Sequence, residues 1–105
     1  MFTDSHCHLS FPELLRGEIR ICLSTLLARQ EREINHSFGW SSPATCYAMA
    51  HAHLAWHRAM ERAGYLRAIR TKGDLEAHCQ ACDKKIELTP LGFIQTMEGA
   101  DPLLV

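Results

Sequence analysis

Leu91-Gly-Phe-Ile-Gln-Thr-Met-Glu98-Gly99 is a continuous, largely apolar stretch that ends in a carboxylate followed by a glycine. Thr89-Pro90 breaks the chain immediately before it, a pattern that is typical of a buried β-strand with a defined start. In α/β barrels the carboxyl ends of parallel strands carry the chemistry, and a glycine there lets other groups approach the backbone closely. The stretch therefore predicts both a main strand of the fold and a candidate functional residue, Glu98.

Strands and helices are predicted to alternate along the rest of the chain. Besides Leu91–Met97, strands are expected at Phe2–His6, Ile19–Leu27 and Leu66–Ile69, although Leu26, Leu27 and Ala28 could equally belong to a helix. Helices are expected at Phe11–Gly17, from Pro43 to about Ala63 and from Gly73 to about Lys84, while Arg29 to Ser42 is expected to form a loop. Such alternation is typical of an α/β fold with a parallel sheet and crossover helices.

The helix from Pro43 to about Ala63 has the clearest ends. Ser42 stands at the capping position, Pro43 at the first helical position, and Gly64 is placed to stop the helix. Apolar side chains recur along it at helical spacing and predict a face that covers a sheet. These residues are Tyr47, Ala50, Leu54, Ala55, Ala59 or Met60, and Ala63.

Size and composition narrow the class of protein. With 105 residues, of which 47% are hydrophobic, the chain is expected to form a single domain over residues 1–105. A formal net charge of −1 argues against nucleic-acid binding, and the apolar run from Ile21 to Ala28 is too short to cross a membrane. We see no secretory signal, and five irregularly spaced cysteines favour a reducing, cytoplasmic setting over a disulfide framework.

His6 and His8 stand two residues apart at the end of the predicted first strand. Residues at positions i and i+2 of a strand point to the same face, so the two imidazoles predict half of a divalent metal site. Asp4 is the nearby carboxylate that would fix the tautomer of a ligating ring. With Glu98 as a ligand able to bridge two ions, the predicted metal ligands are His6, His8 and Glu98.

Other candidate sites have simpler interpretations. His53 and His57 are spaced to clamp a metal from one helix, but no glutamate follows His53, and a solvated helix face is the preferred interpretation. Cys79 and Cys82 share a helix face and are expected to be core residues rather than a zinc or redox pair, since no second such motif exists. The cationic residues Arg67, Arg70 and Lys72 are too few for a nucleic-acid groove.

The ordered set of motifs resembles the membrane (renal) dipeptidase family, zinc peptidases of the amidohydrolase type. Asp4-Ser-His-Cys-His8 is similar to the Asp-x-His-x-Asp opening of that family, and Gly92-Phe-Ile-Gln-Thr-Met-Glu-Gly-Ala-Asp101 to its Met-Glu-Gly-Ala-Asp motif. Between them, Phe11–Gly17 with Ile21–Arg29, and then Leu54–Gly64, also follow the family pattern. The similarity therefore covers nearly the whole chain in order.

The resemblance implies the front part of a (β/α)₈ TIM-type barrel, with residues 1–105 as the amino-terminal segment of a dipeptidase-like enzyme. By position, His6 would bind one zinc ion and Glu98 would bridge two, while His8 stands where the family usually has an aspartate. Asp4 would lie next to the ligands, and dipeptides would be the substrates. Family members draw further histidine ligands from later strands, so this chain is expected to be weakly active or inactive alone.

Two other classes of function stay open. Met1-Phe-Thr-Asp-Ser-His-Cys-His-Leu9 is similar to the opening of the TatD-type metal-dependent DNases, although that similarity covers about a tenth of the chain. The chain could instead be a non-catalytic metal-binding or interaction fragment. A homo-oligomer, or a partner chain that completes the barrel, is expected in that case because an incomplete sheet leaves edges that pair with other strands.

Overall fold

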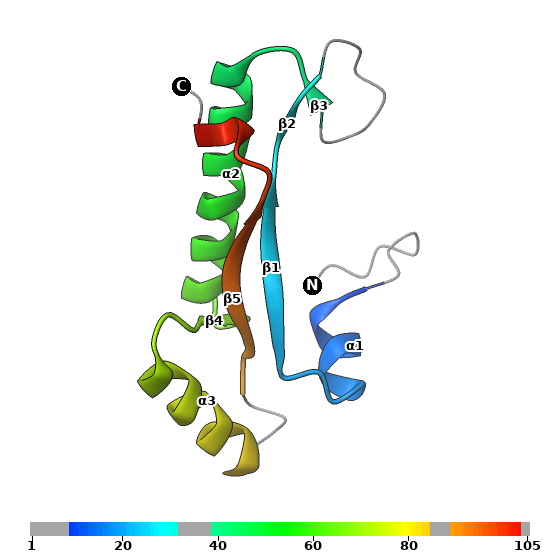
Figure 1. The fold of residues 1–105 in the computed structure, drawn as a ribbon. Helices are drawn as coiled ribbons and strands as arrows, with labels where there is room; N and C mark the ends of the chain where they lie inside the picture. Colours follow the sequence, from blue (N-terminus) through cyan, green and yellow to red (C-terminus); the bar gives the residue numbers. More distant parts are fainter. Residues whose placement is uncertain (1–8, 32–38, 85–88, 104–105) are drawn as a thin grey trace.

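A computed structural model of the chain describes residues 9–31, 39–84 and 89–103, and its layers are visible in Figure 1. Three strands form the main sheet: β1 (Ile21–Leu27), β4 (Leu66–Ala68) and β5 (Leu91–Glu98). The helices are α1 (Phe11–Arg16), α2 (Pro43–Arg62), α3 (Lys72–Lys84) and the short 3₁₀ turn η2 (Asp101–Leu103). A separate two-stranded pair consists of β2 (Arg29–Gln30) and β3 (Gly39–Trp40).

The main sheet is parallel and open, with β5 between β1 and β4. The pairing with β1 extends from Ile21 opposite Gly92 to Leu27 opposite Glu98. The prediction of an α/β fold with parallel strands and crossover helices is confirmed. In a TIM-type barrel each strand pairs with the next one along the chain, whereas here the last described strand separates the two earlier ones, and the described residues form no closed barrel.

Local sequence sets the ends of α2 as predicted. The Ser42 hydroxyl accepts a hydrogen bond from the Thr45 amide at 3.1 Å, and Pro43 occupies the first turn. Gly64 follows the helix with a φ of +88°, a conformation that costs little only for glycine. Tyr47, however, is 45% exposed. The prediction that this residue belongs to the helix face covering the sheet was therefore wrong.

The buried face of α2 is rotated away from the predicted one and carries Cys46, Ala50 and His57. Alanines occur on several sides of this helix, and so the apolar pattern alone fixes its rotation poorly. Contacts with other elements determine the rotation of α2: the Cys46 side chain is fully buried, and the His57 ring lies 5.3 Å from the ring of Phe93. The rotation is therefore a tertiary effect.

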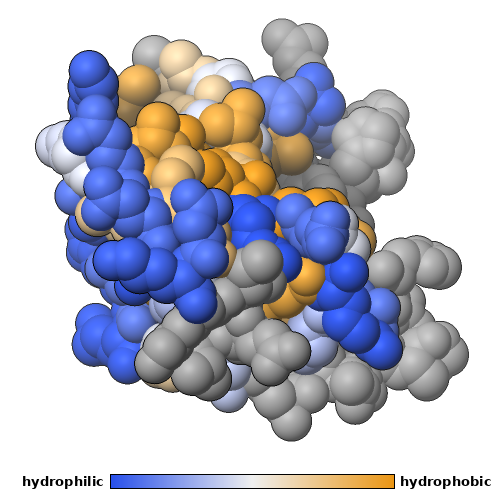
Figure 2. Space-filling model, turned by 90° about the horizontal axis from the view of Figure 1, so that it is seen from below, coloured by the Kyte–Doolittle hydropathy of each residue, from blue (hydrophilic) through white to orange (hydrophobic). Residues whose placement is uncertain are grey.

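The core lies between the sheet, α1 and the carboxyl-terminal half of α2. Its buried centre consists of Leu66, Leu91 and Phe93, against which Phe11 and Leu14 of α1 pack. Figure 2 shows the molecule from the end at which β1 and β5 begin, where a band of hydrophobic residues is bordered by hydrophilic ones.

Within the described ranges, no helix combines the length and the apolar character needed to cross a membrane.

The segment from Arg29 to Ser42 was predicted to be a loop, and this prediction was wrong at both of its ends. Arg29 pairs with Gly39 and Gln30 with Trp40 in parallel register. The Gln30 amide also donates a hydrogen bond to the Asp101 carboxylate at 2.8 Å, which ties this small sheet to η2. Pairs of two-residue strands carry too few residues for a periodic pattern, and so the sequence does not reveal them.

A reciprocal pair of hydrogen bonds begins α3 at Lys72, one residue before the predicted start. The Asp74 amide donates to the Thr71 hydroxyl at 3.0 Å, and the Asp74 carboxylate accepts from the Thr71 and Arg70 amides at 3.1 and 2.9 Å. This arrangement is a capping box with aspartate in the acidic position. The backbone hydrogen bond from Arg70 is the main cause that lowers the pKa of the Asp74 carboxyl below its usual value.

We expect Asp74→Asn to destabilise the protein at neutral pH and to flatten its acid unfolding. Because the folded-state pKa is lowered, the ionised carboxylate contributes stability above its unfolded-state pKa, and this contribution is lost as the pH falls through the folded-state value. Urea unfolding from pH 7 to pH 2 measures the effect. Asp83→Asn, at the other end of α3, is the control, and equal pH profiles for the two variants would contradict the capping role.

Candidate functional site

Glu98 ends β5 at the carboxyl edge of the parallel sheet, where the sequence predicted it. It is the last paired residue of the strand, opposite Leu27 of β1, and its side chain is exposed. Gly99 follows with a φ of +79°, which turns the chain sharply after the strand. The Glu98 carboxylate is thus held on a regular strand while remaining accessible to a ligand from solution.

Glu98 lies on the face of β5 that points away from α2. Alternate residues of a strand point to opposite faces. The ring of Phe93 lies against His57 of α2, so odd-numbered side chains of β5 point toward that helix. Thr96 points the other way and pairs with Thr25 of β1, their hydroxyls 2.9 Å apart. Glu98, two residues beyond Thr96, shares its face of the sheet.

The other predicted site residues, Asp4, His6 and His8, lie outside the described residues. Their convergence with Glu98 on one metal ion therefore stays a prediction. Within residues 9–31, 39–84 and 89–103, no three histidine, cysteine, aspartate or glutamate side chains gather as a metal site would require. Glu98 is thus the predicted ligand whose position the structure describes.

On the opposite face of the sheet, His57 and Ser24 form a hydrogen-bonded pair that sequence reasoning missed. The His57 Nδ1 atom donates to the His53 carbonyl at 2.7 Å, because a carbonyl oxygen can only accept. The Nε2 atom is therefore the acceptor, and the Ser24 hydroxyl donates to it. The interpretation of His57 as a solvated residue was wrong, since its side chain is 7% exposed, and both of its nitrogens are occupied.

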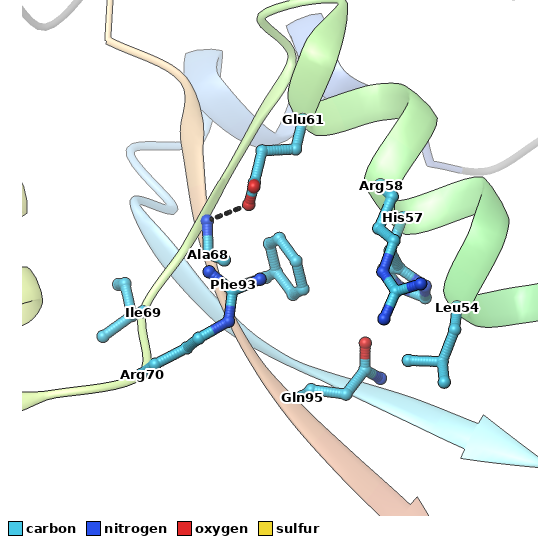
Figure 3. A pocket seen from close by; sticks show the side chains of 9 residues that line it. All are labelled: Leu54, His57, Arg58, Glu61, Ala68, Ile69, Arg70, Phe93 and Gln95. Carbon is cyan, nitrogen blue, oxygen red and sulfur yellow. Dashed lines mark hydrogen bonds between the residues drawn. The ribbon is translucent and has the colours of Figure 1, made fainter.

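A cavity of about 220 Å³ opens next to this pair, between α2 and the sheet. Figure 3 shows the side chains that line it: Leu54, His57, Arg58, Glu61, Ala68, Ile69, Arg70, Phe93 and Gln95. The Glu61 carboxylate accepts a hydrogen bond from the Ala68 amide at 2.9 Å, and the Gln95 side-chain amide donates to the Ser24 carbonyl at 2.6 Å. Much of the polar lining is thus committed to holding α2, β4 and β5 together.

This cavity and Glu98 belong to different sites. The cavity is lined from β5 by Phe93 and Gln95, whose side chains point toward α2, whereas Glu98 is on the opposite face. The exposed guanidinium groups of Arg58 and Arg70 leave the cavity with a cationic margin. The residues that form it come from separate elements, and no spacing in the sequence indicates that they meet.

The two cysteines of α3 lie in different environments. Cys82 is buried and Cys79 is exposed, so the prediction that both are core residues was wrong for Cys79. The Cys82 sulfur lies 3.5 Å from Nε2 of His78, a fully buried ring that donates from the same atom to the Arg20 carbonyl at 2.8 Å. Burial raises the pKa of the Cys82 thiol, which disfavours its thiolate form as metal ligand or nucleophile.

Comparison of the chain with protein families, with curated proteins and with solved structures finds no match.

Proposed function

We propose that the chain carries part of a zinc-dependent, dipeptidase-like hydrolytic site. The observation that supports this most is the placement of Glu98: an exposed carboxylate, followed by a glycine in a left-handed conformation, at the carboxyl end of a parallel strand. Carboxylate oxygens are zinc ligands, and this edge of a parallel sheet is where α/β enzymes place catalytic groups. The resemblance of the ordered motifs to the dipeptidase family adds the histidines.

In this proposal the residues of the chain bind and orient metal rather than transfer protons. The Glu98 carboxylate would hold two zinc ions, the His6 imidazole would bind one of them, and His8 would add a further nitrogen. Asp4 would orient a ligating ring. When bound, zinc would activate a water molecule for attack on the peptide carbonyl of a dipeptide. We place the protein in the cytoplasm, since its irregular cysteine set suits a reducing compartment.

Zinc titration by calorimetry tests the proposed ligands. The unmodified protein should bind zinc, and Glu98→Gln, which keeps the side-chain shape but removes the charge, should weaken binding by at least about tenfold. His6→Ala should do the same. Glu76→Gln, at an exposed position of α3, is the matched control and should bind like the unmodified protein. Zinc binding that is absent, or equal in all the variants, would refute the site.

The purified chain is expected to show little or no peptidase activity with added zinc. Three candidate ligands, His6, His8 and Glu98, cannot supply two zinc ions with the coordination that they require. Hydrolysis of Gly-Asp, followed by amine release, measures this. Robust turnover that disappears in both His6→Ala and Glu98→Ala would contradict the expectation and show that the site is complete.

A TatD-like nuclease is the second candidate, favoured by the Met1–Leu9 opening, in which His-x-His is the native pattern. It predicts DNA cleavage that depends on magnesium or manganese, together with indifference to dipeptides. The formal charge of −1 gives it no electrostatic support. To separate the two candidates, one protein preparation is incubated with plasmid DNA and zinc, magnesium or manganese. DNA cleavage with magnesium or manganese would favour the nuclease.

A further inference from the structure

The cavity between α2 and the sheet has a mainly apolar interior of modest size. Ile69 and Phe93, which are 6% and 5% exposed, line it together with the half-buried Leu54 and Ala68. Its volume of about 220 Å³ corresponds to about seven water molecules, and pockets for drug-sized ligands are larger, about 300–1,000 Å³. The interior therefore suits the apolar body of a small organic molecule.

Two arginine side chains reach toward this cavity from different elements. Arg58 extends from α2, and Arg70 extends from the segment that follows β4. Figure 3 shows their guanidinium groups approaching the same space, beside the Phe93 ring, from opposite sides. Within residues 9–31, 39–84 and 89–103, neither guanidinium forms an ion pair with a carboxylate. Two exposed cationic groups thus converge on a cavity without an anionic partner from the described chain.

The charges of the lining match a ligand with one negative group. His57 is a neutral tautomer, since its Nδ1 atom donates a hydrogen bond and its Nε2 atom accepts one. The Glu61 carboxylate is occupied in part by the Ala68 amide, at 2.9 Å. With two arginines and one glutamate, the lining carries a formal net charge of +1. A monoanion therefore fits this site better than a phosphate dianion or a cation does.

We propose that the cavity is a binding site for a small organic monocarboxylate. The apolar body of the ligand packs against Ile69 and Phe93, and its carboxylate accepts hydrogen bonds from Arg58 and Arg70. Guanidinium groups recognise carboxylates because their N–H donors form a planar fork that matches the two oxygens. The site lies on the face of the sheet opposite Glu98, so it does not depend on zinc binding.

An NMR titration of the metal-free full chain with benzoate tests the site. Benzoate should bind with a Kd of about 1 mM or tighter, a value within reach of so small a ligand. Benzamide has nearly the same shape without the charge, and it should bind at least about tenfold more weakly. Nuclear Overhauser effects should join the benzoate ring protons to the methyl groups of Ala68 and Ile69, which would locate the ligand in the cavity.

Three substitutions then identify the groups that recognise the carboxylate. Arg58→Gln and Arg70→Gln should each weaken benzoate binding by at least about tenfold. Arg62→Gln is the matched control, since it removes the same charge from the exposed end of α2 but lies outside the cavity lining. It should bind benzoate like the unmodified protein. Glu98→Gln should also leave benzoate binding unchanged, which separates this site from the proposed zinc site.

No benzoate binding at concentrations up to about 10 mM would overturn the proposal. Equally tight binding of benzamide, or equal weakening by all three arginine substitutions, would overturn it as well, because the carboxylate would then have no specific partners. Should Arg58→Gln or Arg70→Gln fail to fold, the comparison of benzoate with benzamide and the Overhauser effects to Ala68 and Ile69 decide on the unmodified protein.

Discussion

Gly92→Ala is expected to destabilise the protein by about 1–3 kcal/mol, because a methyl group at this position enters an occupied space. A Cβ on Gly92 would lie 2.6 Å from Nε2 of His78 and 2.8 Å from Cδ1 of Ile69. Both of these side chains are buried, and the His78 ring is held by its hydrogen bond to the Arg20 carbonyl. Neither can therefore move aside without losing contacts. Urea unfolding followed by circular dichroism measures the loss.

Two further variants show whether the close approach is the cause. Gly73→Ala is the matched control: its new Cβ meets nothing closer than 3.7 Å, within α3, and it should stabilise the protein by about 0.5–1 kcal/mol. His78→Ala removes the ring that the new methyl group meets. Combined with Gly92→Ala it should cost less than the sum of the two single losses. Full additivity, or a Gly92→Ala variant as stable as the unmodified protein, would contradict the explanation.

The close contact at Gly92 also illustrates what the sequence could and could not predict. The strand around it was predicted from its apolar run and the preceding Thr89-Pro90, and the ends of α2 from Ser42, Pro43 and Gly64. Those signals act within a few residues. The need for glycine at position 92 arises from a ring on α3, and the place of β5 between β1 and β4 arises from pairings across the whole chain.

The candidate site, too, could be predicted from the sequence only where its signals lie within a few residues. The position of Glu98 at a strand end was predictable, since the strand, the carboxylate and Gly99 are contiguous. The pair of Ser24 and His57 was not, because the two residues are 33 positions apart and no spacing in the sequence links them to each other. Rotation of α2 brings them together, and that rotation depends on packing against β1 and β5 rather than on the helix sequence.

Phe93→Ala is expected to cost about 3–5 kcal/mol, the largest loss that we expect from truncating one of the described side chains. Phe93 is 5% exposed and sits in β5 where the strand is paired on both sides, opposite Cys22 and opposite Ala68. Its ring packs in the core cluster and lies 5.3 Å from the His57 ring. Removing it therefore loosens the sheet and α2 together. A domain of ordinary stability, about 5–15 kcal/mol, would keep little margin.

The control for this variant lies on the same strand and the same face. Met97→Ala truncates a side chain that is 41% exposed, so it should cost less than about 1 kcal/mol. Phe93→Leu, which keeps most of the buried volume, should fall between the two. The midpoint of urea unfolding, read by tryptophan fluorescence, ranks the three variants. If Phe93→Ala and Met97→Ala lose the same amount, β5 is not anchored by Phe93, and Glu98 would lack the rigid strand that holds its carboxylate in place.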